Sequence, residues 1–378
     1  LYRFMRLPVV SYAIPALVAI GQARHFHRPC RFAPWRWLRS AAVPRSLTVL
    51  RRMQPASGGY LEAVPLTSFV VMSLASIGNV DHPVTRDGLR FIRDSYRDDG
   101  SWPIDTNLAT WNTTLALNAL AGGGEDVARL GITNWLLNCQ QQDDHPFTGA
   151  APGGWGWSDL SGSVPDADDT PGALLALNAV RSSTSCEAGD VSRIAASATA
   201  GISWLLRLQN SDGGWPTFCR GWGRLPFDRS GVDLTAHVLR ALHAWRDLRV
   251  GGLEAARQRG MAFIQKNQRA DGSWVPLWFG NQDHPAEENP VYGTAKVLHA
   301  FGDLEKCGTS AGKRGLHWLA SVQNADGGWG CGVEPPAPRS ERKSSVEETS
   351  LAVEALLASG TENLYHSQLL GGLKWLVE

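Results

Sequence analysis

Apolar residues recur along this chain with the spacing of amphipathic helices. In the run 172–180, Leu174, Leu177 and Val180 fall on one face of a helix. A similar short apolar segment, 201–208, comes just before a glycine-rich turn. Strict apolar–polar alternation, which is typical of strands, is weak throughout. The pattern predicts an all-α protein.

One of two recurring tracts is a turn that ends in tryptophan and follows a short apolar helix. Asp-Gly and Gly-Gly pairs give the backbone the freedom to turn directly after a helix. The tryptophans of successive tracts lie 53 to 60 residues apart. The tracts end at Trp102, Trp155, Trp215, Trp274 and Trp329.

The second recurring tract is a threonine with a small residue six positions on and Leu or Phe seven positions on. Each threonine opens an amphipathic segment that we expect to be helical. The threonines are Thr67, Thr113, Thr170, Thr235, Thr294 and Thr349.

The repeating unit is therefore a helix, a turn with Trp, and a second helix. Periods of this length indicate repeat architecture. Units of two helices stack into an α-solenoid or close into a double ring of helices, an α/α toroid.

An unusual acidic stretch, Pro165–Thr170, opens one of these helices and reads Pro-Asp-Ala-Asp-Asp-Thr. A simple acidic cap would explain one carboxylate, because Asp can accept free N–H groups at a helix N-terminus. Only this unit adds Asp166 and Asp169 beside Asp168, which favours chemistry over capping. The position two before each threonine would face one shared space in a ring, and it holds Pro65, Trp111, Asp168, Asp233, Tyr292 and Glu347.

Three close carboxyl groups cannot all ionise cheaply, so we expect a raised pKa and a shared proton. The helix N-terminus acts in the opposite direction and favours charge. The expected outcome is one neutral Asp that serves as a general acid. In a dry pocket it could protonate an alkene, and aromatic faces would hold the resulting cation. The aromatic candidates are Trp111, Trp155, Trp157, Phe218, Trp278 and Tyr292.

For the other turn tryptophans we expect packing between repeats: Trp102, Trp215, Trp274 and Trp329. A Mg²⁺-binding acidic patch is a weaker alternative for the aspartates, because no basic phosphate-binding cluster accompanies them.

Composition narrows the choice of function. The chain has 36 basic and 36 acidic residues, so a broad nucleic-acid-binding surface is not expected. Its six cysteines are scattered and form no Cys-x-x-Cys pair, which suggests a reducing compartment and no finger-type zinc site.

The N-terminal segment is apolar, rich in Arg and carries Trp35 and Trp37. Two interpretations of this segment remain: a patch that contacts a membrane surface, or a helix pair that lacks its packing partner. The stretch Leu7–Ile20 is interrupted by Pro8 and Pro15, so we do not expect it to span a membrane. We expect that both ends of the sequence are cut.

The Gln-x-x-x-Gly-Gly/Ser-Trp tracts beside Asp-x-Asp-Asp-Thr resemble those of the bacterial squalene–hopene cyclases, which are class II terpene cyclases. The resemblance covers nearly the whole chain. Oxidosqualene cyclases look similar but carry Asp-Cys-Thr-Ala-Glu where this chain has residues 168–172. The resemblance therefore implies an unoxidised linear polyprene, squalene or a similar lipid, cyclised to a hopanoid-type product.

The resemblance also implies roles for individual residues. Asp168 would be the proton donor, tuned by Asp166 and Asp169. Substrate-lining aromatics would be Trp111, Trp157, Phe218, Trp278 and Tyr292. No cofactor and no metal are implied.

By the same resemblance, residues 1–110 would form part of one α-barrel with an apolar membrane-facing segment. Residues 111–378 would form the catalytic α/α barrel, its last repeat truncated. Such enzymes sit monotopically on the membrane, here on the cytoplasmic side of a bacterial membrane, and a homodimer is kept as an option.

One departure concerns a family His that hydrogen-bonds the central Asp, expected between the third Trp tract and the next helix. Residues 218–233 hold no His but contain Arg224 near the expected place. An Arg beside Asp168 would favour its ionised form. A second departure is Gly172, which stands where the family has a larger residue early in the catalytic helix.

Three rival interpretations share a helical ring or repeat. A protein prenyltransferase β-subunit would need Asp, Cys and His on zinc, with Cys331 as the candidate. A thioester domain would need a Gln that residues 330–334 lack. A non-catalytic helical repeat protein that binds a lipid or a partner is the third.

Overall fold

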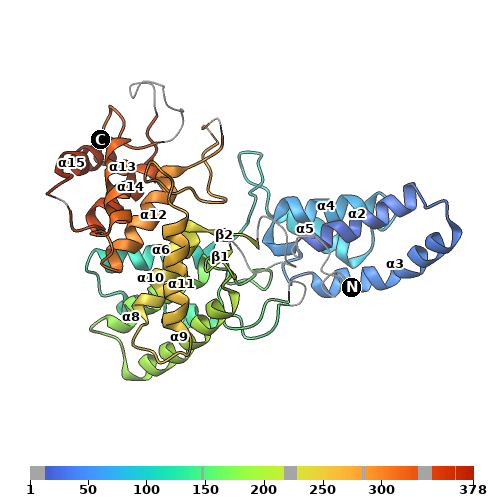
Figure 1. Ribbon diagram of the computed structural model, residues 1–378. Helices are drawn as coiled ribbons and strands as arrows, with labels where there is room; N and C mark the ends of the chain where they lie inside the picture. Colours follow the sequence, from blue (N-terminus) through green and yellow to red (C-terminus); the bar gives the residue numbers. More distant parts are fainter. Residues whose placement is uncertain are drawn as a thin grey trace.

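The computed structural model describes residues 13–145, 149–216, 228–282, 284, 286–330, 343–361 and 363–378. Its helices gather into two lobes, a smaller one at the N-terminal end of the chain and a larger one (Figure 1). Within the described residues, strand is limited to one antiparallel pair, β1 (Trp215–Pro216) and β2 (Ser230–Gly231). The prediction of an all-α repeat protein is confirmed.

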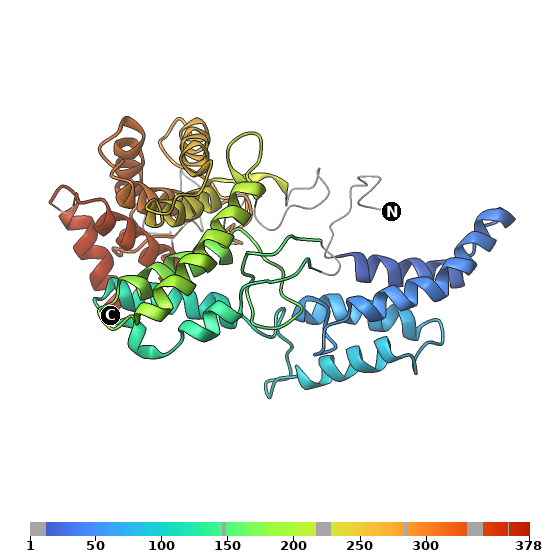
Figure 2. The same ribbon diagram turned by 90° about the horizontal axis from the view of Figure 1, so that it is seen from below.

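The larger lobe has two layers of helices. Inner helices pack against one another in chain order, and each is joined to an outer helix that covers it. Seen from the second direction, the hairpins curve around a common centre (Figure 2). The inner helices are α6 (Ala109–Gly122), α8 (Asp169–Ser182), α10 (Val232–Ala244), α12 (Pro290–Asp303) and α14 (Val346–Ala358). The outer helices are α7 (Thr133–Asn138), α9 (Ala188–Leu208), α11 (Leu253–Lys266), α13 (Ser310–Ser321) and α15 (His366–Val377).

Tryptophan at the turn joins three elements of each unit, as Trp274 illustrates. Its backbone N–H donates to Thr294 Oγ1 at 2.9 Å and its indole N–H donates to the Ile264 carbonyl at 2.8 Å. The ring also lies against the next outer helix, where a Cβ added to Gly315 would come within 2.6 Å of it. Trp155, Trp215 and Trp329 make the same three kinds of contact and are fully buried.

A glutamine at the start of the turn ties each unit to its successor. The Gln268 amide donates to the Gly272 carbonyl in its own turn and to the Ala311 carbonyl on the next outer helix, both at 2.9 Å. Gln140, Gln209 and Gln323 form equivalent pairs of bonds. In each unit one amide group thus bridges a turn carbonyl and a carbonyl of the next outer helix, which ties neighbouring units together through polar contacts.

The threonine tract is confirmed in five helices and shifted in one. Thr67, Thr170, Thr235, Thr294 and Thr349 are fully buried. In α6, however, Thr110 and Leu117 are buried, whereas Thr113 is half-buried and Leu120 is exposed. The expected start at Thr113 is therefore wrong by one helical turn, since Thr110 also has Ala and Leu six and seven residues on.

The smaller lobe contains a further copy of the turn with Tyr60 in place of Trp. The Tyr60 backbone N–H donates to Thr67 Oγ1, and its hydroxyl donates to the Leu50 carbonyl ten residues earlier. Gln54 bonds the Gly58 and Val84 carbonyls. This lobe consists of α2 (Ile14–His27), α3 (Ala33–Met53), the short helix η2 (Tyr60–Glu62), α4 (Val64–Ala75) and α5 (Pro83–Asp94).

The lobes meet at η2. Leu61 and Glu62 adopt left-handed backbone angles, with φ of 55° and 57°. Thr106 N–H donates to the Glu62 carbonyl, and the Glu62 side chain is only 1% exposed beside Gly162. Non-glycine residues rarely adopt this conformation, so the contact with the loop that precedes α8 holds two strained residues.

Helix α3 projects at the far end of the smaller lobe (Figure 1). Trp35 and Trp37 on it are 55% and 71% exposed. Residues 1–12, which include the first part of the apolar stretch Leu7–Ile20, lie outside the described residues. Among the helices that are described, none is long and apolar enough to cross a membrane.

Candidate active site

Asp166 is the residue that caps α8. Its Oδ1 accepts the backbone N–H groups of Asp168 at 2.9 Å and Asp169 at 2.7 Å. Its own N–H donates to the Trp155 carbonyl at 3.0 Å, which fixes the loop on the preceding turn. Capping in this way satisfies donors that the helix leaves free.

Asp166 and Asp169 form a coupled, buried pair. Asp166 is 2% exposed and Asp169 is 5% exposed. Burial raises the pKa of Asp166 to about 7, and the charge of Asp168 adds to this, although hydrogen bonds from Asp169 oppose it. Burial and the charge of Asp166 hold the pKa of Asp169 well above its usual range. The predicted raised pKa and shared proton follow from these contacts.

Asp168 differs from its two neighbours. It is half-buried, and its carboxyl group makes no hydrogen bond with the described residues. Burial raises its pKa, and the Lys296 ammonium works against that rise. Asp169 Oδ1 also has no hydrogen-bond partner in the described part of the chain, but of the three side chains only that of Asp168 is not fully buried.

His237 lies beside Asp168, and the sequence analysis missed it. Burial lowers the pKa of its ring well below the usual value, and the nearby Asp168 backbone acts weakly in the opposite direction. The histidine expected before the helix is thus found inside α10, two residues after Thr235. The signal was the repeat itself, since Gly172 and Lys296 hold the same position in their units.

Two more residues share the surroundings of Asp168. Burial raises the pKa of Asp233 to about 6, with a further contribution from the charge of Asp168. Tyr292 is 8% exposed, and burial together with the charges of Asp168, Asp233 and Glu347 raises its pKa well above the usual value. The structure therefore brings together the residues that precede the threonines of α8, α10, α12 and α14.

The aromatic candidates differ in their burial and in their contacts. Tyr292 stacks on Phe279, with ring centroids 5.2 Å apart. Trp157 is half-buried, its indole N–H has no hydrogen-bond partner in the described part of the chain, and its carbonyl accepts the Trp111 N–H at 3.2 Å. Trp278 is 38% exposed. Phe218 and Arg224 lie outside the described residues.

Trp155 was a candidate for cation stabilisation and proves to be structural. It is fully buried and makes the turn contacts described for Trp274. Trp215, Trp274 and Trp329 pack as expected, while Trp102 is 48% exposed. Trp111 is half-buried on α6, and the shifted start of that helix at Thr110 moves it away from the position equivalent to Asp168.

Below the aspartates, the inner helices present charged side chains to one another. Arg240 of α10 bonds Asp303 of α12 at 2.6 Å, and His299 of α12 contacts Glu354 of α14 at 3.2 Å. Lys296 of α12 lies 5.4 Å from the Tyr292 ring centroid.

No group of three His, Cys, Asp or Glu residues placed to hold a metal ion occurs within the described ranges. Cys331, the candidate zinc ligand of one rival interpretation, lies outside them.

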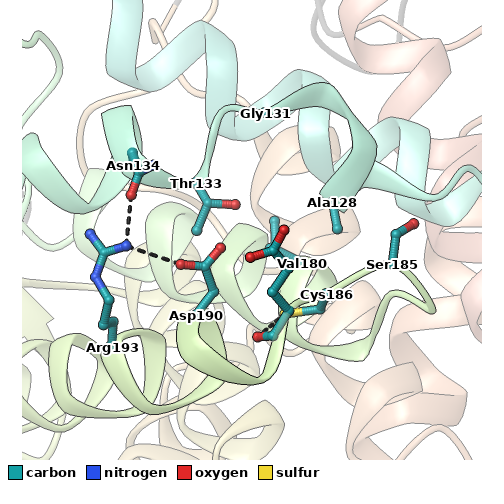
Figure 3. A pocket seen from close by; sticks show the side chains of 10 residues that line it. Ala128, Gly131, Thr133, Asn134, Val180, Ser185, Cys186, Asp190 and Arg193 are labelled. Carbon is teal, nitrogen blue, oxygen red and sulfur yellow. Dashed lines mark hydrogen bonds and ion pairs between the residues drawn. The ribbon is translucent and has the colours of Figure 1, made fainter.

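A pocket of about 390 Å³ opens at the other end of α8, near Val180 (Figure 3). Its polar side chains pair with each other: Arg193 bonds Asn134 at 2.7 Å and Asp190 at 3.0 Å. Val180 is twelve residues after Asp168, about 18 Å along a helix, so the pocket is separate from the acidic site.

Comparison with known proteins places these features in a family. Residues 107–378 match the family described as the squalene–hopene cyclase C-terminal domain. The chain belongs to the squalene–hopene cyclase family. The match begins close to the start of α6, so it covers the whole larger lobe.

Two known relatives are distant from this chain in sequence. A squalene–hopene cyclase of Bradyrhizobium diazoefficiens is 26% identical over 90% of this chain and 53% of its own length. A drimenyl diphosphate synthase of Streptomyces showdoensis is 30% identical over 68% of this chain and 42% of its own length. This chain thus spans about half the length of these two relatives, and only 22% of the enfumafungin synthase of Hormonema carpetanum.

A solved structure supports the fold. The ent-copalyl diphosphate synthase from Streptomyces platensis superposes with a TM-score of 0.53 at 23% identity, over 77% of this chain and 48% of that one.

Proposed function

We propose that this chain carries the proton-donating site of a class II terpene cyclase, which closes a linear polyprene into a polycyclic product. The division of labour among three aspartates carries this proposal. Asp166 caps α8, Asp169 bonds Asp166, and the carboxyl of Asp168 stays free.

Asp168 is the general acid. Its O–H bond breaks as a C–H bond forms at one carbon of the terminal alkene, leaving a carbocation on the other carbon and a carboxylate on Asp168. Burial raises the pKa of Asp168 and so favours the protonated acid before the reaction, and Lys296 favours the carboxylate after it. His237 lies beside the backbone of Asp168.

Successive alkenes then attack the cation and form new C–C bonds. Release of a proton to water ends the cascade, so the product is an isomer of the substrate and no co-reactant is consumed. Tyr292, Trp157, Trp111, Trp278 and Phe218 stabilise the cations through their ring faces. The buried Tyr292 beside Asp168 supports this role most directly.

Squalene or a similar polyprene is the reference substrate, and a hopanoid-type polycycle the reference product. We place the enzyme at the cytoplasmic surface of a bacterial membrane, as a peripheral protein. The exposed Trp35 and Trp37 on α3, near Arg36 and Arg39, support contact with lipid there.

Product analysis after incubation with squalene tests the cyclase. We expect cyclised product from the wild type and from Asp143→Asn, an exposed control in another loop. Asp168→Asn should lower turnover at least a hundredfold with unchanged helical content. Equal product from Asp168→Asn, or loss of folding in that variant, would contradict the assignment.

A further inference from the structure

Lys296 occupies the space that the inner helices share. It lies one helical turn after Tyr292 on α12, about 6 Å further along the helix axis. Its ammonium acts electrostatically on Asp168 of α8, on Asp233 and His237 of α10, and on Glu354 of α14. These effects on three other helices agree with an ammonium that lies among the inner helices, 5.4 Å from the Tyr292 ring centroid.

The neighbouring charges at this level are already paired. Arg240 bonds Asp303 at 2.6 Å, and His299 contacts Glu354 at 3.2 Å. His237 is held in its neutral form, because burial lowers its pKa well below the usual value. By contrast, the described chain places no carboxylate oxygen within 4.0 Å of the Lys296 ammonium, whose one close contact is the Tyr292 ring.

Neither nearby aspartate pairs directly with this charge in the working state. Asp168 must be neutral before it donates its proton. Asp233, whose pKa burial raises to about 6, is mostly ionised near neutral pH, but it lies in no ion pair with Lys296. A half-buried ammonium without a carboxylate in contact is costly, and it would repel a carbocation nearby. An anion brought by the substrate would remove both penalties.

We propose that Lys296 binds the anionic head group of a polyprene substrate, a phosphate ester or a carboxylate, while the far end of the prenyl chain reaches Asp168. This inference rests on the proposed function and narrows it from a neutral hydrocarbon to an amphiphilic polyprene. The alkene then lies beside Asp168, and the oxyanion of the head group lies beside Lys296.

Equilibrium binding tests the subsite without depending on turnover. The Asp168→Asn protein is titrated with farnesyl diphosphate, farnesoic acid and farnesol, with a chelator present so that no divalent cation bridges. Lys296→Met in the same background should weaken binding of the anionic ligands about tenfold or more. Farnesol should bind the two proteins equally.

Two control variants complete the experiment. Lys296→Arg should restore most of the affinity, and Lys266→Met on the exposed side of α11 should leave it unchanged. Which of the two anionic ligands loses more affinity identifies the head group. Equal binding of all ligands with and without Lys296, or the same loss for farnesol, would overturn the proposal.

The head-group inference and the cyclase assignment can be contradicted independently of each other. If wild type turns over no polyprene but the binding of anions depends on Lys296, the cyclase assignment fails alone. If polyprenes are cyclised and Lys296→Met binds the anions normally, the head-group inference fails alone.

Discussion

The two faces of the repeating unit follow different rules. Away from the centre, the same bonds recur: Trp to Thr, indole to a carbonyl, and Gln to two carbonyls. At the centre, the units of α8, α10, α12 and α14 all differ. The position two after the threonine holds Gly172, His237, Lys296 and Leu351, and the position five after it holds Leu175, Arg240, His299 and Glu354.

This difference has a physical cause. The turn contacts satisfy backbone groups at helix ends and fill the space between hairpins, so they set the geometry of each unit. Because that geometry does not depend on the central positions, those positions can vary freely. The fold should therefore tolerate changes at the centre that abolish chemistry, and should not tolerate changes at the turns.

The largest expected effect on stability is at a turn tryptophan. Trp274→Ala should lower the free energy of unfolding by about 3 to 5 kcal/mol, because a fully buried ring and its two N–H bonds are lost. Trp102→Ala, at a residue that is 48% exposed, should cost no more than about 1 kcal/mol. Urea unfolding of both variants makes the comparison, and equal costs would show that the turns are not the structural face.

At the centre, the expected effect depends on pH. Asp166 has a pKa of about 7 in the folded protein against 3.8 ordinarily, so the folded state holds the extra proton between these values. Stability should therefore fall as pH rises from about 4 to about 7. Asp166→Asn keeps the capping oxygen but removes the charge.

The fall in unfolding free energy across that range should be about 4 kcal/mol smaller in Asp166→Asn than in wild type. Buried histidines titrate in the same range with the opposite sign, but they are common to both proteins and cancel in the difference. Parallel curves for the two proteins would mean that Asp166 is ionised in the fold at all these pH values.

A smaller effect is expected where the tryptophan ring meets the next outer helix. Gly315→Ala places a Cβ within 2.6 Å of the Trp274 ring and should cost about 1 to 2 kcal/mol. Gly189→Ala on α9 has no atom within 4 Å and should be neutral or slightly stabilising. Thermal unfolding separates them, and a stabilised Gly315→Ala would show that the interface is loosely packed.

The smallest expected effect concerns the turn with tyrosine. Tyr60→Phe removes the bond from the hydroxyl to the Leu50 carbonyl and should cost about 1 kcal/mol. Tyr96→Phe, at a residue that is 55% exposed, should cost nothing measurable. If the two variants behave alike in denaturant, the Tyr60 turn is not equivalent to the tryptophan turns.

Sequence patterns predicted the turn tryptophans well because their tracts combine several residues at fixed spacing. They missed the Tyr60 turn, where the aromatic differs although Gln54 and Gly58 keep their places. They also started α6 at Thr113, since Thr110 satisfies the same pattern and only burial separates the two.

The site was harder to predict, because the central positions do not set the geometry of the repeat and so share no common residue pattern. Asp166, Asp168 and Asp169 are adjacent in sequence, so their cluster was visible. His237 and Lys296 lie on other helices, and in the sequence only their shared place two residues after a repeat threonine relates them to Asp168. The separate tasks of the three aspartates also depend on which backbone N–H groups each can reach.

The glutamine bonds have a consequence for biosynthesis. Gln209 finds its second acceptor at Ala256, and Gln268 finds its own at Ala311, each more than forty residues later. A hairpin emerging from the ribosome therefore waits for the following one before its polar contacts are complete. Nascent-chain assembly should advance in steps of one unit, each step locking the hairpin made before it.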